Sequence, residues 1–393
     1  MNAEEIARYR TDTPGTQKVL HFNNAGASLI PKVVFDSVNT YLESEYLMGG
    51  YETCDKYAAA FQFTKDKLAE LIGASAGEIA LLESATTAWY KAFAGLSFEP
   101  GDIVLTSKTE YVSNFLGLLR EKKQQGIQIE LIPDNEYGEI DVEKMEKMMG
   151  PKVKLIAISH IPTNGGLVQP AAAVGKIAKK HKVPYLLDAC QTVGQIPIDV
   201  NELACDMLSA TGRKFLRGPR GTGFLYVRKS FMDQLQPPLP DLFSFTWDSP
   251  DAYLPREGAI RFENYEKHFA GHVGLGVAAD YALEIGVERI WARVLSLSTE
   301  LRQRLNSITG VQTQDLGQHP CGIVTFTAEQ KSAEEIKAFC NSQSINVSLV
   351  MAEGALLDMG PRGLGNMIRA SVHYYNTEEE IETFVNTLSS FLK

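Results

Sequence analysis

Short apolar runs alternate with segments of helical periodicity along the first part of the chain. The runs predict seven strands, at Ile79–Leu82, Ile103–Thr106, Gln128–Ile132, Leu155–Ser159, Tyr185–Asp188, Met207–Ala210 and Gly223–Val227. Between them, apolar residues recur at helical spacing, as at Ala58–Leu71, Asn114–Gln125 and Ala172–His181. Strands that are apolar on both faces are typical of a parallel sheet covered by helices. The alternation therefore predicts an α/β fold with a mainly parallel, seven-stranded sheet.

The pattern changes near Leu275. One long helical stretch, Leu275–Ile308, is followed by shorter strand and helix patterns at Gly322–Thr327, Ala333–Gln343, Val347–Met351 and Met367–Tyr374. Thr377 is the predicted N-cap of a last helix, and Glu380, three residues on, completes a capping box. We therefore predict a large α/β domain over residues 16–275 and a smaller α+β domain over residues 276–393, to which residues 1–15 also belong.

Composition and charge narrow the class of protein. With 44% hydrophobic and 22% charged residues, the 393-residue chain is typical of a folded globular protein. Its net charge of −10 argues against a nucleic-acid or membrane-surface partner, and no apolar stretch is long enough to span a bilayer. The N-terminus has no apolar signal segment, and the five cysteines are widely spaced. We therefore expect reduced thiols and a cytoplasmic location.

The most informative segment is Thr211–Gly223, which lies between two predicted strands and contains Lys214. Arg213, Arg217 and Arg220 surround this lysine, and nearby like charges favour a neutral, nucleophilic amine. The arginines are also suited to binding a phosphate. Taken alone, an arginine-rich segment of this kind is more often an exposed basic turn.

Two further segments support a site for pyridoxal phosphate. Asp188 ends a predicted strand 26 residues before Lys214, and ligands of α/β sheets bind at such strand ends. That cofactor needs a lysine for its Schiff base and an acid for its ring nitrogen. Ser84–Thr87 opens a predicted helix after a strand, which is an anion-binding arrangement. Each segment alone could be a plain helix cap.

Seven segments form a pattern that extends over nearly the whole chain: His21–Gly26, Ser84–Thr86, Thr109–Tyr111, Ser159–Pro170, Asp188–Gln191, Thr211–Lys214 and Ile368–Glu380. With these segments, the chain from about His21 to Phe384 resembles the class V aminotransferase group of fold-type I pyridoxal-phosphate enzymes, which includes the cysteine desulfurases. The motifs span most of the chain in the family's order. The resemblance implies a fold-type I transferase fold and a homodimer.

The resemblance also implies roles for individual residues. Lys214 would carry the cofactor and act in catalysis. The other cofactor contacts implied are Ala85 and Thr86 at the phosphate, Tyr111 over the ring, Asp188 at the ring nitrogen, Gln191 at the phenolic oxygen, and Thr163, Thr211 and Arg213. Arg369 would bind the substrate α-carboxylate, and Asn24 and Ala25 would line the substrate pocket.

The chain departs from the family pattern at positions that affect the reaction. Arg213 replaces a histidine before the lysine, Tyr111 replaces the stacking histidine, and Thr163 stands where asparagine is usual. Cysteine desulfurases also carry a cysteine on a loop before the Arg-x-Ser motif. The corresponding stretch, Met351–Met367, contains none, so a persulfide has no acceptor there.

We therefore predict a pyridoxal-phosphate enzyme that performs β-elimination on a cysteine-derived amino acid. An aminotransferase, an amino-acid epimerase and a non-catalytic scaffold remain alternatives. His268 and His272 are four residues apart but form no HExxH motif, so we predict no metal site. Cys190, beside Asp188, is interpreted as a small buried packing residue.

Overall fold

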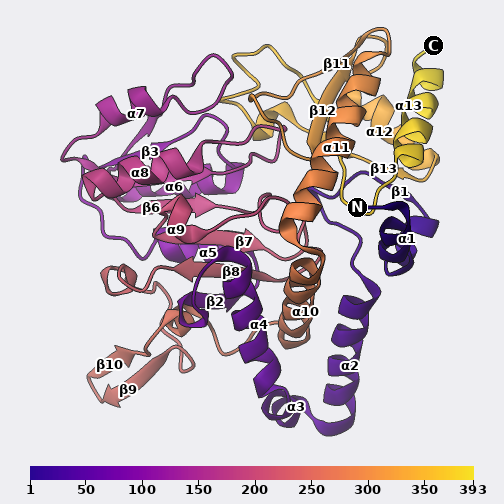
Figure 1. Ribbon diagram of the computed structural model, residues 1–393. Coiled ribbons are helices and arrows are strands. Elements are labelled where there is room, and N and C mark those ends of the chain that lie inside the picture. The colour runs from indigo at the N-terminus through magenta and orange to yellow at the C-terminus, as the bar shows by residue number, and fades with distance from the viewer.

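The computed structural model describes residues 1–393 (Figure 1). Seven strands form its central sheet, in the order β2–β8–β7–β6–β5–β3–β4. Their bounds are β2 Ile79–Leu82, β3 Ile103–Thr106, β4 Gln128–Leu131, β5 Val153–Ser159, β6 Tyr185–Asp188, β7 Met207–Thr211 and β8 Gly223–Val227. Only β8 runs antiparallel to its neighbours, β2 and β7. The predicted mainly parallel, seven-stranded sheet is therefore confirmed.

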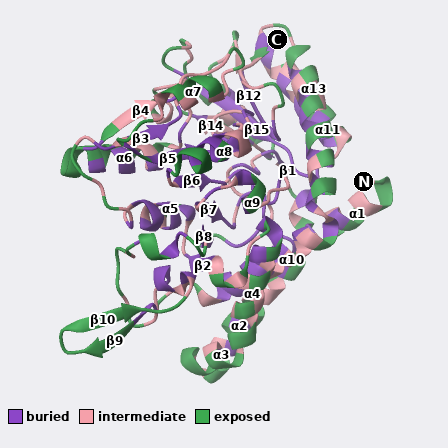
Figure 2. Ribbon diagram, turned by 60° about the vertical axis from the view of Figure 1, so that its left-hand side comes forward, coloured by how far each residue is buried: buried purple, intermediate pink, exposed green.

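Helices that alternate with these strands cover the sheet. Their bounds are α4 Ala58–Ile72, α5 Ala85–Phe93, α6 Val112–Gln125, α7 Val142–Met148, α8 Ala171–His181 and α9 Val200–Leu203. Strands β2, β6, β7 and β8 are buried along their whole length, as Figure 2 shows in purple. Burial on both faces explains why these strands are uninterrupted apolar runs.

A second, antiparallel sheet of four strands, in the order β11–β12–β15–β14, lies towards the C-terminus. Its bounds are β11 Val311–Thr313, β12 Ile323–Ala328, β14 Ser348–Val350 and β15 Met367–Ser371, with α12 Ala333–Ser342 and α13 Glu378–Leu392 beside it. The predicted capping box of the last helix is present, because Thr377 and Glu380 bond to each other's amides. The short strand β1 (Leu20–His21) pairs in parallel with β13 (Ile345–Asn346) and so ties residues near the N-terminus to this part.

The predicted single helix Leu275–Ile308 is wrong. The chain forms two helices there, α10 (Phe269–Ile285) and α11 (Val287–Asn306), and Gly286 separates them. Gly286 has φ = 87°, a conformation that interrupts a right-handed helix and that glycine adopts without a side-chain clash. The predicted domain boundary after residue 275 falls inside α10, and the division into two domains stays a prediction.

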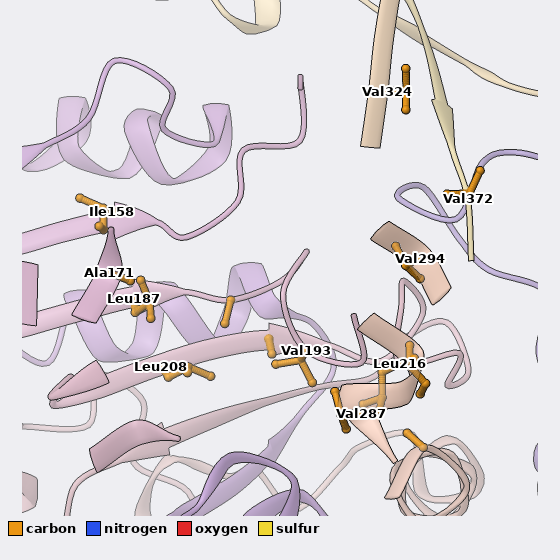
Figure 3. Packing of buried hydrophobic residues seen from close by; sticks show 14 of the residues in the cluster. Ile158, Ala171, Leu187, Val193, Leu208, Leu216, Val287, Val294, Val324 and Val372 are labelled. Atoms are coloured by element: carbon orange, nitrogen blue, oxygen red, sulfur yellow. The ribbon is translucent and has the colours of Figure 1, made fainter. Parts of the chain in front are cut away.

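The two sheets share one large hydrophobic core. A single cluster of 60 buried residues extends from Ile158, Leu187 and Leu208 in the central sheet to Val324 in the second sheet. Val294, on α11, belongs to the same cluster, and Figure 3 shows it below Val324. Packing of this kind fixes the strand ends of one sheet relative to the other.

The remaining elements lie outside the sequence predictions. They are α1 Ala3–Thr11, α2 Lys32–Met48, α3 Gly50–Lys56, the hairpin strands β9 Phe245–Ser249 and β10 Ala252–Pro255, and 3-10 turns at Pro14–Gln17, Ala76–Glu78, Met232–Gln234, Ala259–Phe262 and Ala352–Gly354. The hairpin projects from the body and is largely exposed (Figures 1 and 2). None of the helices has the length and apolar character needed to cross a membrane.

Candidate active site

A pocket lies at the carboxyl ends of the parallel strands, where sequence analysis placed the site. It encloses about 530 Å³ of space, part of it open to solvent. The pocket is lined by Ser84, Ala85, Thr86, Tyr111, Asn114, Ser159, Ile161, Thr163, Asp188, Cys190, Gln191, Thr211, Arg213 and Lys214. Every residue predicted to contact the cofactor is among them. Segments up to 130 residues apart in the chain therefore converge on one cavity.

Lys214 follows β7 and is buried, with 7% of its surface exposed. Burial is the largest influence on its amine and lowers its pKa; Asp188 opposes that shift, and the guanidiniums of Arg213 and Arg369 add to it. Loss of hydration penalises the ammonium form. The structure thus supplies a lysine that is more readily deprotonated than one in water.

Two arginines expected to act on Lys214 lie elsewhere. Arg217 is turned towards the N-terminal segment, where Nε donates to the Leu29 carbonyl at 2.9 Å and Nη2 to the Thr13 hydroxyl at 2.6 Å. Arg220 is exposed to solvent. Of the three arginines in this segment, only Arg213 lines the pocket.

Asp188 ends β6 and is held by two donors. Its Oδ2 accepts a hydrogen bond from Asn114 Nδ2 at 2.8 Å, and its Oδ1 accepts one from the Cys190 amide at 2.9 Å. Only 5% of its surface is exposed. These bonds fix the direction of the carboxylate, which suits an acid that must meet one ring nitrogen.

Glu110 is a buried acid behind Asp188 that sequence analysis did not single out. It accepts hydrogen bonds from the Ser159 amide at 2.7 Å, the Ser159 hydroxyl at 2.6 Å and Asn114 Nδ2 at 2.9 Å. Burial, followed by the charge of Asp188, raises the pKa of Glu110 to about 7. Its position between Thr109 and Tyr111, just after a predicted strand, is the feature of the sequence that could have identified Glu110 as a site residue.

The turn before α5 offers main-chain donors to the pocket. Ser84 is the N-cap, and its hydroxyl accepts from the Thr87 amide at 3.1 Å. The amides of Ala85 and Thr86, in the first turn, have no partner within the helix. A Cβ on Gly223 would lie 2.7 Å from the Ser84 carbonyl carbon, so only glycine lets β8 approach this turn.

Thr163 joins the cofactor side of the pocket to Arg369. Its hydroxyl accepts from Gln191 Nε2 at 3.0 Å and from Arg369 Nη1 at 2.6 Å. Gln191 Nε2 also donates to the Ala25 carbonyl at 3.1 Å, whereas its Oε1 is buried without a partner. That free atom is an acceptor, so the predicted contact with a phenolate oxygen would require the Gln191 amide to reorient.

The aromatic ring of Tyr111 faces Lys214. The distance from Lys214 Nζ to the ring centroid is 5.8 Å. Cys190 also lines this pocket and is half-buried, so its interpretation as a packing residue alone is corrected. Burial and the neighbouring Asp188 raise the pKa of the Cys190 thiol well above its ordinary value, which keeps it protonated.

Of the residues predicted to line the substrate pocket, Asn24 lies away from it. Its side chain is fully buried and donates to the Ser371 carbonyl at 2.7 Å. The neighbouring Asn23 is the one that reaches the site, because its Oδ1 accepts from Arg369 Nη2 at 3.4 Å. Ala25 is held by its amide, which donates to the Ser371 hydroxyl at 2.8 Å.

Comparison with known proteins identifies the family. The sequence profile described as aminotransferase class-V matches residues 20–384, nearly the whole chain. The chain belongs to the class V aminotransferase family. Enzymes of this family depend on pyridoxal phosphate, and the resemblance and fold type predicted from the sequence are confirmed.

This class V chain is similar to curated proteins along its full length. It is 28% identical to a probable cysteine desulfurase of Methanothermobacter thermautotrophicus, covering 99% of this chain and 98% of the relative. It is also 28% identical to a probable cysteine desulfurase of Pyrococcus abyssi, with 98% and 97% covered.

Solved structures share the fold of the class V chain. The apo cysteine desulfurase of Thermococcus onnurineus matches with a TM-score of 0.91 at 28% identity, covering 98% of both chains. The cystine C–S lyase C-DES, solved with its product cysteine persulfide, matches with a TM-score of 0.86 at 23% identity, covering 96% of this chain and 99% of that chain.

The residues of this class V chain fit pyridoxal phosphate. The fixed carboxylate of Asp188, the buried amine of Lys214 and the open amides before α5 are polar groups that line one cavity. Gly223 leaves room for the turn that would bind the phosphate. Buried polar groups without partners are uncommon in folded proteins, and a bound ligand accounts for them.

Proposed function

We propose that this class V enzyme is a carbon–sulfur lyase that performs β-elimination on a cysteine-derived α-amino acid without a loop thiol. The observation that carries the proposal is a complete pocket around Lys214 and Asp188 combined with a β14–β15 loop that has no cysteine. The relatives named cysteine desulfurase and the cystine C–S lyase of the same fold support the sulfur-containing substrate.

The loop between β14 and β15 is held in place by side chains other than cysteine. Met359 anchors it and is fully buried. Arg362 bonds to Asp358 at 3.3 Å and to the Gln314 carbonyl at 2.5 Å. The one thiol in the pocket, on Cys190, is a poor nucleophile because burial keeps it protonated. An elimination that releases sulfur directly needs neither thiol.

Pyridoxal phosphate, when bound, supplies a cationic ring that accepts the electron pair left at Cα. Asp188 holds a proton at the ring nitrogen, and Arg369 binds the α-carboxylate. Lys214 Nζ takes the proton from Cα. The Cβ–S bond then breaks with its electron pair going to sulfur, and the released 2-aminoacrylate takes up water to give pyruvate and ammonium.

The test is product analysis with L-cystine, L-cysteine and S-substituted cysteines, in the absence of an oxo-acid acceptor. Many equivalents of pyruvate and ammonium per chain are expected from at least one of these substrates. One equivalent of oxo acid would show an aminotransferase, a D-amino acid would show an epimerase, and alanine with sulfide would show desulfuration through a thiol. Any of these three results contradicts the lyase.

Lys214→Ala is the matched negative control. It should bring pyruvate formation to background, because the Cα proton then has no acceptor, while the thermal unfolding temperature stays close to that of the wild type. Cys190→Ala should keep most of the activity if no thiol takes part. A Cys190→Ala variant that is inactive but folded would overturn the thiol-free route.

A cytoplasmic homodimer is part of the same proposal. Large apolar side chains are exposed along α2 and α3, including Phe35 at 55%, Tyr46 at 87%, Leu47 at 70% and Tyr51 at 71%. Such a patch marks an interaction surface, and a second copy of the chain fits the family. Light scattering should give the mass of two chains, and Tyr46→Glu should shift it towards one. The five free cysteines agree with a reducing compartment.

A further inference from the structure

Two arginines lie at one side of the pocket, where an α-carboxylate needs only one. Arg213 lines the pocket, and Arg369 bonds to Thr163, which is a lining residue. Arg369 donates to the Thr163 carbonyl at 2.8 Å and to its hydroxyl, and Arg213 donates to the Gly26 carbonyl. The hydrogen bonds of both guanidiniums go to neutral oxygens, including the Asn23 amide oxygen. Both cations therefore lack a carboxylate partner within the protein.

Arg213 lies on the Arg369 side of the pocket. Its side chain bonds Gly26, in the same short segment as Asn23, which bonds Arg369. The two guanidiniums are close enough that Arg213 contributes, after burial, to lowering the pKa of Arg369 to about 10.

Two neighbouring, partly desolvated cations repel each other, and an anionic ligand relieves that repulsion. One α-carboxylate satisfies Arg369, and Arg213 is then available for a second anionic group of the substrate. We propose that Arg213 is a specificity-determining residue that selects α-amino acids whose side chain ends in an anionic group. This inference rests on the proposed function for the reaction but concerns only which substrate the same pocket binds.

Binding of unreactive amino acids tests this without relying on the reaction. L-Aspartate and L-asparagine have nearly the same shape and differ in side-chain charge. Titration of the cofactor-loaded enzyme, followed by the absorbance of the bound cofactor, should show aspartate binding at least tenfold more tightly than asparagine. Equal affinities for the two in the wild-type enzyme would overturn the proposal, whatever reaction the enzyme catalyses.

Variants then assign the preference to one residue. Arg213→Gln should remove most of the preference for aspartate, with asparagine binding within about twofold of wild type, and Arg213→Lys should keep part of the preference. Arg220→Gln, at an exposed position of the same segment, is the matched control and should behave as wild type. If Arg213→Gln weakens cofactor binding and leaves the preference intact, Arg213 serves the phosphate and the proposal is wrong.

A reactive pair extends the test to turnover. S-Sulfo-L-cysteine has an anionic side chain, and its elimination with one water gives pyruvate, ammonium, thiosulfate and a proton. S-Methyl-L-cysteine is the neutral partner. The ratio of kcat/KM for S-sulfo-L-cysteine to kcat/KM for S-methyl-L-cysteine should be at least tenfold lower in Arg213→Gln than in the wild type. Because both enzymes are compared on the same two substrates, the difference between the leaving groups cancels. If neither substrate gives pyruvate, the lyase proposal is contradicted and the binding result still stands.

Discussion

Asn114 Nδ2 donates to Asp188 at 2.8 Å and to Glu110 at 2.9 Å, so one amide group bridges two buried carboxylates. Both hydrogens of that amide are used, and each is donated to a carboxyl oxygen, one on Asp188 and one on Glu110. Ser159, the Tyr111 amide and the Thr106 hydroxyl are the other donors to Glu110. The direction of the Asp188 carboxylate therefore depends on a residue of α6, in a different part of the chain.

Replacing this bridge should impair catalysis without removing any group that touches the substrate. In Asn114→Leu, Asp188 loses one of its two donors, and hydrogen bonds to charged groups contribute about 1.5–3 kcal/mol. We expect kcat to fall roughly 10- to 100-fold and the absorbance of the bound cofactor to titrate at a different pH. Asn341→Leu, on the exposed side of α12, is the control. Unchanged titration of the cofactor in Asn114→Leu would contradict a positioning role.

The buried acid Glu110 should make stability depend on pH. Its pKa is about 7 in the folded chain, compared with about 4.3 in an unfolded one. Between these values the folded chain holds a proton that the unfolded chain has released. The free energy of unfolding therefore falls as pH rises through this window, by up to about 1.4 kcal/mol per pH unit, and levels off above it.

Thermal unfolding between pH 5 and pH 8 measures this contribution. The unfolding temperature of Glu110→Gln should fall less steeply with pH than that of the wild type, because the variant has no group to titrate. Glu353→Gln, at an exposed loop position, should follow the wild-type slope. If the unfolding temperatures of the wild type, Glu110→Gln and Glu353→Gln all change with pH at the same rate, Glu110 titrates near its ordinary pKa.

The sequence was most informative where burial is complete. Strands Ile79–Leu82, Tyr185–Asp188 and Gly223–Val227 were predicted with the bounds that the structure has, because both of their faces are covered and all positions except the terminal Asp188 and Gly223 are apolar. The hairpin β9–β10 has no such signal, since most of its residues are exposed. The break at Gly286 was missed because apolar periodicity continues on both sides of a single glycine.

The sequence predicted which segments form the site, but it did not always predict which side chain of a segment faces it. Asp188 ends β6 and Lys214 follows the neighbouring strand β7, so their segments could be placed together from the sequence alone. Whether Asn23 or Asn24 faces the site depends on a bridge between Asn23 and Ser371, some 350 residues apart in the chain. The role of Asn114 is set by a contact between α6 and the end of β6, which no local pattern reveals.

Gly223 should be needed for the phosphate turn. In Gly223→Ala the new Cβ would lie 2.7 Å from the Ser84 carbonyl carbon and 2.8 Å from the Ala85 amide nitrogen, so the turn must move. We expect a loss of about 1–3 kcal/mol in stability and at least tenfold weaker cofactor binding. Gly150→Ala, where an added Cβ meets nothing within 4 Å, is the control. Cofactor affinity is measured by absorbance titration. If Gly223→Ala binds the cofactor as tightly as the wild type, this role of the turn is contradicted.

Arg217 should hold the loop of Lys214 against the N- and C-terminal segments. It is 2% exposed, its guanidinium lies 4.4 Å from the ring centroid of Tyr375, and its main-chain amide donates to the Lys214 carbonyl at 2.9 Å. Because Nε and Nη2 bond to Leu29 and Thr13, a lysine cannot satisfy both partners. Arg217→Lys should therefore lower the free energy of unfolding in urea by about 2–4 kcal/mol and weaken cofactor binding. Arg220→Lys, three residues on and exposed, should change neither quantity, and equal stability of the two variants would show that the buried contacts of Arg217 contribute little.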